Sequence, residues 1–444
     1  MPVDKKYGFS YISDDSQACD ATSAFFLTQL NARYLRDAKS HGCAKIIKAT
    51  EVSKILGIKN IKIIGITGTN GKTTTAAAIY SIILDLGHKV ALQGTRGYFI
   101  NDVRIQEKGL TTPSIFETMK NIKDAIDEGC EYFIMEVSSH AIVQNRIDGL
   151  HFALKIFTNV TQDHLDYHKS MDAYIGVKSS FFDDETPKLI NKDDKKIRYN
   201  PKNCRTYGVE NHATYKILAY SLDDGIQAAL AKIENVCEFH SPLHGFFNLY
   251  NILAAIGAVD MLDIASLDDI CDVGENFMGV EGRMEVISDN PLIIVDFAHT
   301  PDGMKKVMDS LKEKKIVVVF GAGGDRDRNK RPKMGFIASK FAKKIMVTSD
   351  NPRSEDPKMI IEDILMGIKQ KTNLIVESDR KKALLKALKW QEKDEVLLVL
   401  GKGDETYQEI KGQKYPFDDR TIIKNELSCH RDTIMTNPQE QVDY

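Results

Sequence analysis

Short runs rich in Val, Ile and Leu recur along the 444-residue chain, separated by stretches with helical patterning. Near-continuous apolar runs predict strands buried on both faces, and strands that alternate with helices predict parallel α/β sheets. Ligands of such sheets bind beyond the carboxyl ends of the strands, so functional residues are expected there. The runs cover residues 61–67, 132–137, 154–160, 292–297, 316–320, 344–348 and 396–400.

The length predicts two or three domains, at about 150 residues for each. Residues 1–60 have a weaker pattern and are expected to form a small N-terminal domain, followed by a central domain over 61–282 and a C-terminal domain over 283–444. The second break is expected near residues 279–284. The polar segment 193–203 is predicted to be a surface loop, and the tail at 437–444 is predicted to be loose.

The bulk composition excludes several classes of protein. Apolar residues make up 42% and charged residues 28%, which is ordinary for a globular protein, and a net charge of −3 with scattered lysines argues against nucleic-acid binding. Seven cysteines with no C-x-x-C pair argue against a disulfide framework or a zinc knuckle. No segment approaches the roughly 18 apolar residues of a membrane span, and the N-terminal MPVDKKYGFS lacks the apolar core of a signal peptide. A cytoplasmic protein without membrane insertion is expected.

The segment IKIIGITGTNGKTTT at residues 61–75 runs from strand through a Gly-rich turn into a helix. In such a turn, backbone N–H groups and the helix N-terminus bind phosphate oxygens. Lys72 can reach the outer phosphates, and the Thr73 hydroxyl can bind Mg²⁺. The spacing from Gly65 to Gly71 is one residue longer than in the usual motif, which leaves an ordinary turn as the alternative. A phosphate loop alone does not separate a hydrolase, a kinase, a ligase and a switch.

Two later segments carry candidate metal ligands. Glu136 ends the run 132–137, where a carboxylate beside a phosphate loop is a natural Mg²⁺ ligand. His164 follows the run 154–160, and the crowding of polar side chains around it favours function over simple packing. The neighbours are Asn159, Asp163, Asp166 and His168.

A series of motifs extends over nearly the whole chain: GTNGKTTT, TTPS, EVSSHAIVQNR, FTNVTQDHLDYH, YIGVK, FNLYN, GRME, DFAHTPD, GGDRDRNKRPKMG, SDNPRSEDP and GKGDE. In content and order, the series resembles the Mur ligase family. The resemblance implies an α/β protein with a small N-terminal UDP-binding domain, a central P-loop ATPase-like domain with a parallel sheet, and a C-terminal Rossmann-like domain.

The resemblance also implies an activity. It indicates an ATP-dependent amide ligase that adds meso-diaminopimelate to the D-Glu γ-carboxylate of UDP-MurNAc-L-Ala-D-Glu through an acyl-phosphate, in cytoplasmic peptidoglycan precursor synthesis. Its partners would be these small molecules and two Mg²⁺ ions, and the protein would be a monomer.

Four catalytic residues follow from the resemblance: Lys72, Glu136, His164 and Lys178. Lys178 in YIGVK would be carbamylated, as N6-carboxylysine, and would bind one Mg²⁺ with His164, while Thr73 and Glu136 bind the other. A carbamate suits this role because it is an anion with two oxygens, whereas an ammonium repels a cation.

Eleven residues would bind ATP. Asn251 would contact the adenine, although a helix N-cap is the alternative for this residue. The set comprises Gly68, Thr69, Asn70, Gly71, Lys72, Thr73, Thr74, Asn251, Arg283, Asp296 and His299.

The same resemblance assigns the other two substrates. UDP-MurNAc-dipeptide would contact Ser16, Thr111, Thr112, Ser138, Gln144 and Arg146. Hydroxyl, amide and guanidinium groups suit an anionic sugar-peptide. For TTPS, the alternative is a capped helix start with Pro113 in the first turn. The family usually carries Arg where this chain has Gln17.

Diaminopimelate would bind the motifs SDNPRSEDP, GGDRD and GKGDE through Arg326, Asp350, Asn351, Pro352, Arg353, Gly401 and Glu405. Arg353 can pair with the second carboxylate in two-point fashion, and Glu405 can hold the distal ammonium. A surface salt bridge is the alternative for Arg353. Relatives often carry His where this chain has Asp404.

Three other functions compete with this interpretation. A sibling ligase would use L-lysine or another amino acid, or extend folate with glutamate, but DNPR and EVSSH with VQNR argue against it. A P-loop switch protein would need neither the DNPR motif nor a third domain. A non-catalytic homologue is disfavoured because Lys72, Glu136, His164 and Lys178 are all present.

Overall fold

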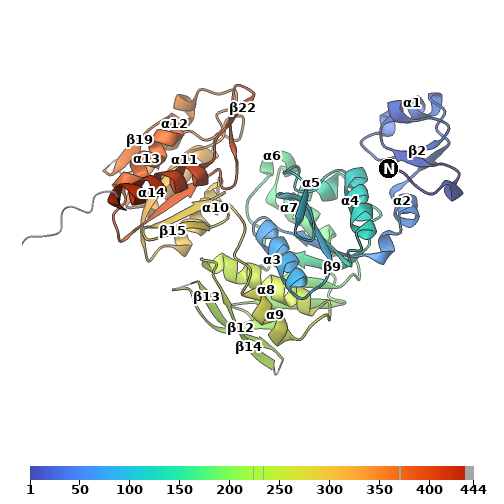
Figure 1. The fold of residues 1–444 in the computed structure, drawn as a ribbon, viewed down its shortest axis with the longest axis horizontal. Coiled ribbons are helices and arrows are strands. Elements are labelled where there is room, and N and C mark those ends of the chain that lie inside the picture. Colours follow the sequence, from blue (N-terminus) through green and yellow to red (C-terminus); the bar gives the residue numbers. More distant parts are fainter. Residues whose placement is uncertain (224, 234, 370–371, 436–444) are drawn as a thin grey trace, which may run out of the picture. The chain divides into compact units, whose positions relative to one another are not determined.

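The computed structural model describes residues 1–223, 225–233, 235–369 and 372–435 (Figure 1). The chain forms two compact units. The first comprises Met1–Pro242 with Asn248–Met278, and the second comprises Leu243–Phe247 with Gly279–Tyr444. The division at Gly279 falls at the predicted break, while the three domain boundaries stay predictions. The tail predicted to be loose, residues 437–444, lies outside the described residues.

An 11-stranded sheet organises the first unit. Its central strands are parallel and buried, because their apolar side chains face helices on both sides. The spatial order is β14 (Asn235–Ser241), β13 (Ile226–Lys232), β12 (Tyr215–Ser221), β11 (Cys204–Gly208), β10 (Lys188–Asn191), β9 (Phe152–Phe157), β4 (Lys62–Thr67), β8 (Tyr132–Glu136), β5 (Val90–Gly94), β6 (Gly97–Ile100) and β7 (Val103–Gln106).

The main helices beside the central strands are α3 (Lys72–Asp85), α4 (Ile115–Asp127), α5 (Ser139–Val143), α7 (Met171–Ser180), α8 (Phe246–Asp260) and α9 (Leu267–Gly274). Of these, α3, α7 and α8 carry residues of the candidate site. Helix α3 packs against β4, β5 and β8, and also against α9. Helix α4 buries Met119 and Ile122 in the core that includes Phe133 and Met135 of β8.

The N-terminal segment builds a small parallel sheet of its own from β1 (Tyr11–Ser13), β2 (Ser23–Phe26) and β3 (Lys45–Ile47). Its buried residues Ile12 and Phe26 nevertheless belong to the same hydrophobic cluster as Phe133 of the central sheet. The boundary predicted at residue 60 therefore separates two sheets that share one core.

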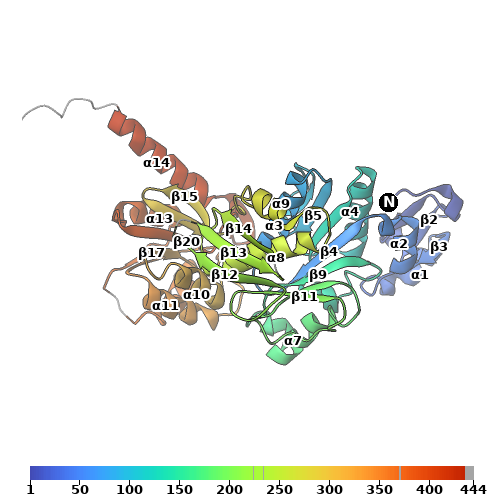
Figure 2. The same cartoon turned by 90° about the horizontal axis from the view of Figure 1, so that it is seen from below.

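The second unit is a three-layer α/β sandwich, visible in Figures 1 and 2. Helices α10 (Pro301–Ser310), α11 (Lys330–Phe341) and α12 (Pro357–Leu365) cover one face of the sheet, and α13 (Arg380–Trp390) and α14 (Asp419–Met435) cover the other. The sheet order is β15 (Glu285–Asp289), β16 (Leu292–Asp296), β20 (Glu395–Leu400), β17 (Lys315–Phe320), β18 (Lys344–Val347) and β19 (Leu374–Val376), and only β15 runs antiparallel.

The predicted apolar runs are confirmed as strands in both units, and residues 193–203 form the predicted loop between β10 and β11. The antiparallel extension β12–β14 of the first sheet was not predicted. Its signal was the alternation of buried and exposed residues, which β14 shows from Val236 to Ser241. No helix within the described ranges is long and apolar enough to cross a membrane.

Candidate active site

The predicted phosphate loop is a tight turn between β4 and α3. Gly71 precedes α3 with φ 84°, a left-handed conformation that favours glycine, and a Cβ there would collide with the Asn251 amide oxygen. Lys72 begins the helix, and its Nζ donates to the carbonyl oxygens of Gly68 at 2.8 Å and Thr69 at 3.0 Å. The loop thus presents its backbone and one ammonium at the carboxyl end of β4.

The segment after β9 holds this loop in place. The Thr158 hydroxyl and the Asn159 amide both donate to the carbonyl oxygen of Asn70, at 2.7 and 3.0 Å. The Asn70 N–H donates to Asn159 Oδ1 at 3.1 Å. Asn159 therefore supports the loop, and the Thr69 hydroxyl lies 3.1 Å from the Tyr174 hydroxyl of α7.

Glu136 ends β8 and is almost fully buried beside α3. The Thr73 hydroxyl donates to its Oε2 at 3.0 Å. Thr95, which was not predicted as a site residue, donates its backbone N–H to Glu136 Oε1 at 2.8 Å and its hydroxyl to Oε2 at 3.3 Å. Thr74 lies one residue further along α3 and is buried. These contacts fix the carboxylate at the mouth of the phosphate loop.

Lys178 of α7 is only 1% exposed, so it is not an ordinary surface lysine. Its Nζ donates to the Gly68 carbonyl oxygen at 2.9 Å and lies 4.9 Å from the centre of the Tyr174 ring. Burial, reinforced by the nearby Lys72 ammonium, holds the pKa of the Lys178 amine well below its usual range. An amine with a lowered pKa keeps more of the neutral form that reacts with carbon dioxide.

His164 lies at the start of α6 (Leu165–His168), with φ 53°. Its ring packs edge-on against His140 and Tyr174, and Nε2 lies 3.3 Å from Asp163 Oδ2. His168 is instead buried against the Ser139 hydroxyl, at 2.9 Å. The side chain of Asp166 lies outside the described part of the chain, and within that part no three His, Cys, Asp or Glu residues form a metal cluster.

The residues expected to bind the sugar-peptide adjoin Glu136. The Thr112 hydroxyl donates to the Glu136 carbonyl oxygen at 2.8 Å and accepts the Ser138 N–H at 3.0 Å. The Arg146 guanidinium donates to the Thr112 carbonyl oxygen at 2.7 Å and to Gln144 Oε1. In a further contact, the Thr111 hydroxyl lies 3.1 Å from that of Thr95.

Two predicted helix caps need correction. Asn251 is not the N-cap of α8, because it is the sixth residue of that helix, buried against the phosphate loop. The TTPS segment does start a capped helix, since the Ser114 hydroxyl accepts the Glu117 N–H at 3.2 Å. Pro113, however, precedes this N-cap and so lies outside the first turn.

Ser16 follows Asp15, which caps a short 3-10 helix in the N-terminal sheet region. The Ser16 hydroxyl donates to Asp37 Oδ2 at 2.6 Å, and the Gln17 amide donates to the same oxygen at 2.8 Å. No hydrogen bond joins Ser16 to Thr111, Thr112, Ser138, Gln144 or Arg146 within the described residues.

In the second unit, Asp296 ends β16 and accepts the backbone N–H groups of Met284 at 2.8 Å and Ala298 at 2.7 Å. The Arg283 guanidinium lies 4.1 Å from the centre of the Phe297 ring, and His299 contacts the same ring edge-on. The three residues predicted to face the nucleotide therefore gather around one strand end.

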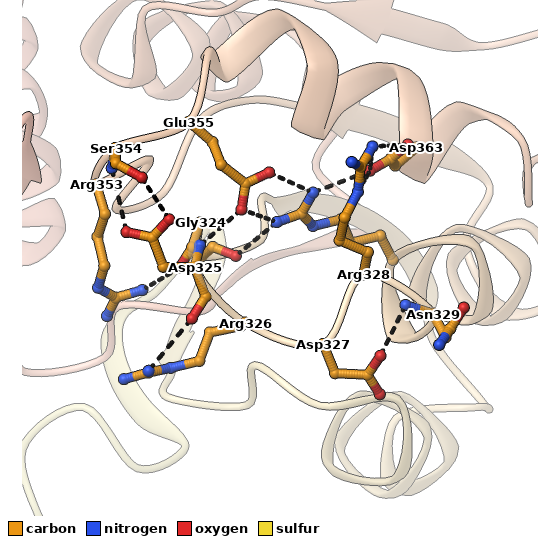
Figure 3. Close-up of polar contacts among 12 residues, drawn as sticks. Gly324, Asp325, Arg326, Asp327, Arg328, Asn329, Arg353, Ser354, Glu355 and Asp363 are labelled. Carbon is orange, nitrogen blue, oxygen red and sulfur yellow. Dashed lines mark hydrogen bonds and ion pairs between the residues drawn. The ribbon is translucent and has the colours of Figure 1, made fainter. Parts of the chain in front are cut away.

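The DNPR motif follows β18 and packs against the loop that follows β17 (Figure 3). Arg353 Nη1 donates to the Gly324 carbonyl oxygen at 2.7 Å, and Nε donates to Glu409 of β21 (Tyr407–Ile410) at 3.2 Å. Pro352 lies so close that a Cβ on Gly324 would collide with its carbonyl oxygen. Arg326 is exposed in the same loop, two residues after Gly324 (Figure 3).

The GKGDE motif follows β20 and meets the same site. Glu405 Oε2 accepts the Asn351 amide at 2.8 Å and the ammonium of the fully buried Lys402 at 3.0 Å. Gly401 passes so close to Asp350 that a Cβ would collide with that carboxylate. The residues predicted to bind diaminopimelate thus line three neighbouring strand ends, while Lys402 and Glu409 were missed because no spacing relates them to Arg353.

Comparisons with known proteins agree with this architecture. The sequence model of the Mur ligase middle domain matches residues 66–259, and that of the Mur ligase glutamate ligase domain matches residues 282–403. The chain belongs to the Mur ligase family, a family of α/β ligases, as the motif series predicts.

Individual relatives are similar over almost their whole length. The UDP-N-acetylmuramoyl-L-alanyl-D-glutamate–2,6-diaminopimelate ligase of Wolinella succinogenes is 54% identical, over 94% of this chain and 96% of the relative. The enzyme of the same name from Helicobacter pylori is 49% identical, over 94% and 96%. A solved structure with this name superposes with a TM-score of 0.70 at 29% identity, covering 95% of each chain.

Proposed function

We propose that this protein is an ATP-dependent ligase that joins meso-diaminopimelate to the D-Glu γ-carboxylate of UDP-N-acetylmuramoyl-L-alanyl-D-glutamate. The observation that carries this proposal is the convergence of the phosphate loop, buried Glu136 and buried Lys178 in one unit. Relatives at 54% and 49% identity are named as ligases of this amino acid. An ATP co-substrate fits the family and the loop. A cytoplasmic monomer is part of the proposal.

In the proposed reaction, the substrate carboxylate attacks the γ-phosphorus of ATP and displaces ADP, which gives an acyl-phosphate. The amine of the amino acid then displaces phosphate and forms the amide. The loop amides and Lys72 would bind the phosphates, and Thr112, Ser138 and Arg146 would orient the sugar-peptide. Water must be kept from the acyl-phosphate, since hydrolysis would waste it.

The residues present fit magnesium at this site. The Thr73 hydroxyl and the Glu136 carboxylate are oxygen donors 3.0 Å apart beside the loop, and oxygen donors are what Mg²⁺ prefers. Bound Mg²⁺ would neutralise charge that develops on the transferring phosphoryl group. We further propose that Lys178 reacts with carbon dioxide, loses a proton and becomes a carbamate that serves a second Mg²⁺ with His164.

On the amino-acid side, Arg353 offers Nη2, which has no hydrogen-bond partner among the described residues, to the second carboxylate of diaminopimelate. Glu405 would hold the distal ammonium through Oε1, because Oε2 is already occupied by Asn351 and Lys402. A substrate without the second carboxylate would leave Arg353 Nη2 without a hydrogen-bond partner from the substrate, which disfavours L-lysine.

The test is incubation with ATP, the UDP-MurNAc-dipeptide and either meso-diaminopimelate or L-lysine, followed by measurement of product mass. We expect one ADP and one phosphate for each amide formed, and only with diaminopimelate. Amide formation with L-lysine would identify a sibling ligase, and ATP hydrolysis without an amide would identify a switch protein.

A further inference from the structure

A charged cluster around Arg331 and Glu355 joins the loop that follows β17 to the DNPR loop that follows β18. Figure 3 labels Glu355 with Gly324 and Arg353 of these loops. Arg331 of α11 is 0% exposed, and its guanidinium donates to both carboxylate oxygens of Glu355, at 2.7 and 2.9 Å. A buried guanidinium must be paired, because an unpaired buried charge costs several kcal/mol. The Arg331–Glu355 pair is therefore expected to be a rigid contact within the second unit.

This pair holds in place the Gly324 carbonyl group, which accepts a hydrogen bond from the Arg353 guanidinium. Arg331 Nη2 donates to the carbonyl oxygen of Gly323 at 3.3 Å, and the Asp325 N–H donates to Glu355 Oε1 at 2.6 Å. Both neighbours of Gly324 are thus held by one ion pair. Gly324 in turn accepts Arg353 Nη1 at 2.7 Å.

A second contact joins the loops from the DNPR side. The Ser354 hydroxyl donates to Asp325 Oδ1 at 2.6 Å, and the Ser354 N–H donates to Oδ2 at 3.3 Å. Arg353 itself has φ 51°, a conformation that a non-glycine residue keeps only when its surroundings impose it. Asp325 and Ser354 lock the residue next to Arg353, so the guanidinium is oriented before any ligand arrives.

We propose that Glu355, together with Arg331 and Asp325, is a positioning residue that aims Arg353 at the second carboxylate of the amino-acid substrate and so sets the selectivity for a diacid over L-lysine. This inference rests on the proposed function. A two-point pairing between an arginine and a carboxylate tolerates little misplacement, and a shift of about 1 Å can lower the reaction rate 10²-fold. None of the three residues needs to touch the substrate.

The test compares two substitutions at the same guanidinium. Glu355→Gln removes the partner that joins Arg331 to the loops, whereas Asp363→Asn removes the other carboxylate partner, 2.9 Å from Arg331 Nη1. Among the described residues, Asp363 contacts the loop after β17 only through Arg328, outside the Gly323–Asp325 segment that supports Arg353. We expect Glu355→Gln to raise the KM for meso-diaminopimelate about tenfold or more, with the KM for ATP nearly unchanged and the preference over L-lysine reduced by a similar factor. Asp363→Asn should keep both the KM and the preference while lowering stability comparably.

A second, milder variant keeps the proposal testable if Glu355→Gln fails to fold. Ser354→Ala opens the contact with Asp325 and leaves no buried charge unpaired, so it should fold and raise the same KM by a smaller factor. Equal effects of Glu355→Gln and Asp363→Asn on that KM, or wild-type kinetics in both Glu355→Gln and Ser354→Ala, would overturn the positioning role alone. A wild-type protein inactive with meso-diaminopimelate would instead overturn the proposed function, and this inference with it.

Discussion

The phosphate loop of the first unit and the arginine loop of the second handle charge in opposite ways. In the first, the Nζ atoms of Lys72 and Lys178 both donate to the same carbonyl oxygen, that of Gly68, at 2.8 and 2.9 Å. In the second, Arg331 and Arg353 each meet a carboxylate, Glu355 and Glu409. One site gathers two amines on a backbone oxygen, and the other pairs its charges internally.

This difference indicates what each site requires from its ligand. Two amines on one carbonyl group gain most when an anion arrives, whether a phosphate or, at Lys178, an added carboxyl group. A ligand adds little electrostatic stabilisation to the arginine loop, because the arginines of this loop are already paired with carboxylates. The loop instead orients the Arg353 guanidinium toward the ligand. We therefore expect changes in the first site to affect turnover and changes in the second to affect selectivity.

The largest effect is expected for Lys178→Ala, which removes the group proposed to become an anion beside the phosphate loop. Turnover should fall about 10³-fold, as when a group that stabilises transition-state charge is lost. Added bicarbonate should not restore turnover. A short carboxylic acid that enters the space left by the removed side chain should restore turnover in part. Steady-state ADP release measures both.

Lys188→Ala is the matched control, because Lys188 is equally buried and donates to the carbonyl oxygens of Asp184 and Lys202 at 2.9 Å, away from the loop. Its turnover should stay close to that of the wild type. Equal losses in the two variants would mean that Lys178 acts only through stability.

An intermediate effect is expected for Gly71→Ala, in which the new Cβ meets the Asn251 amide. Displacement of the loop should lower kcat/KM for ATP about a hundredfold. Gly87→Ala shares the backbone strain, since φ is 85° at Gly87 and 84° at Gly71, but its Cβ meets nothing within 4 Å. Comparable losses of kcat/KM in both variants would show that backbone strain alone, and not the loop contact, matters.

The smallest effect concerns stability against acid in the second unit. The Arg331 guanidinium lowers the pKa of the Glu355 carboxyl from 4.5 to about 2. Because the folded pKa lies below the unfolded one, the stabilisation is complete above pH 4.5 and is lost as the pH falls towards 2. At neutral pH, Glu355→Gln should lower the free energy of unfolding by roughly 1.5–3 kcal/mol, and the difference should vanish near the lower pKa.

Trp390, the single tryptophan of the chain, lies in α13, so its fluorescence reports unfolding of the second unit. The measurement is the melting temperature of wild type and Glu355→Gln from neutral pH downwards. Parallel curves over the whole range would contradict the assigned cause of the lowered pKa.

Much of the fold could be predicted because its signals are local. Runs such as 316–320 and 396–400 are apolar enough to require burial on both faces, and 61–75 carries strand, turn and helix in one segment. The antiparallel strands β12–β14 were not predicted because they lack long apolar runs. Asn251 was assigned a capping alternative because sequence alone does not fix where α8 begins.

The sequence by itself determined the strands, the phosphate loop and the motifs that mark the family, since each depends on neighbours in the chain. Only the tertiary structure decided that Thr95 holds Glu136, that Lys178 is buried on Gly68 and that Glu355 joins two loops. These contacts connect residues 41, 110 and 30 positions apart. No local sequence pattern encodes these contacts, because strand order and packing bring such distant residues together. The same packing sets the burial of these residues and the charges around them, which determine their chemistry.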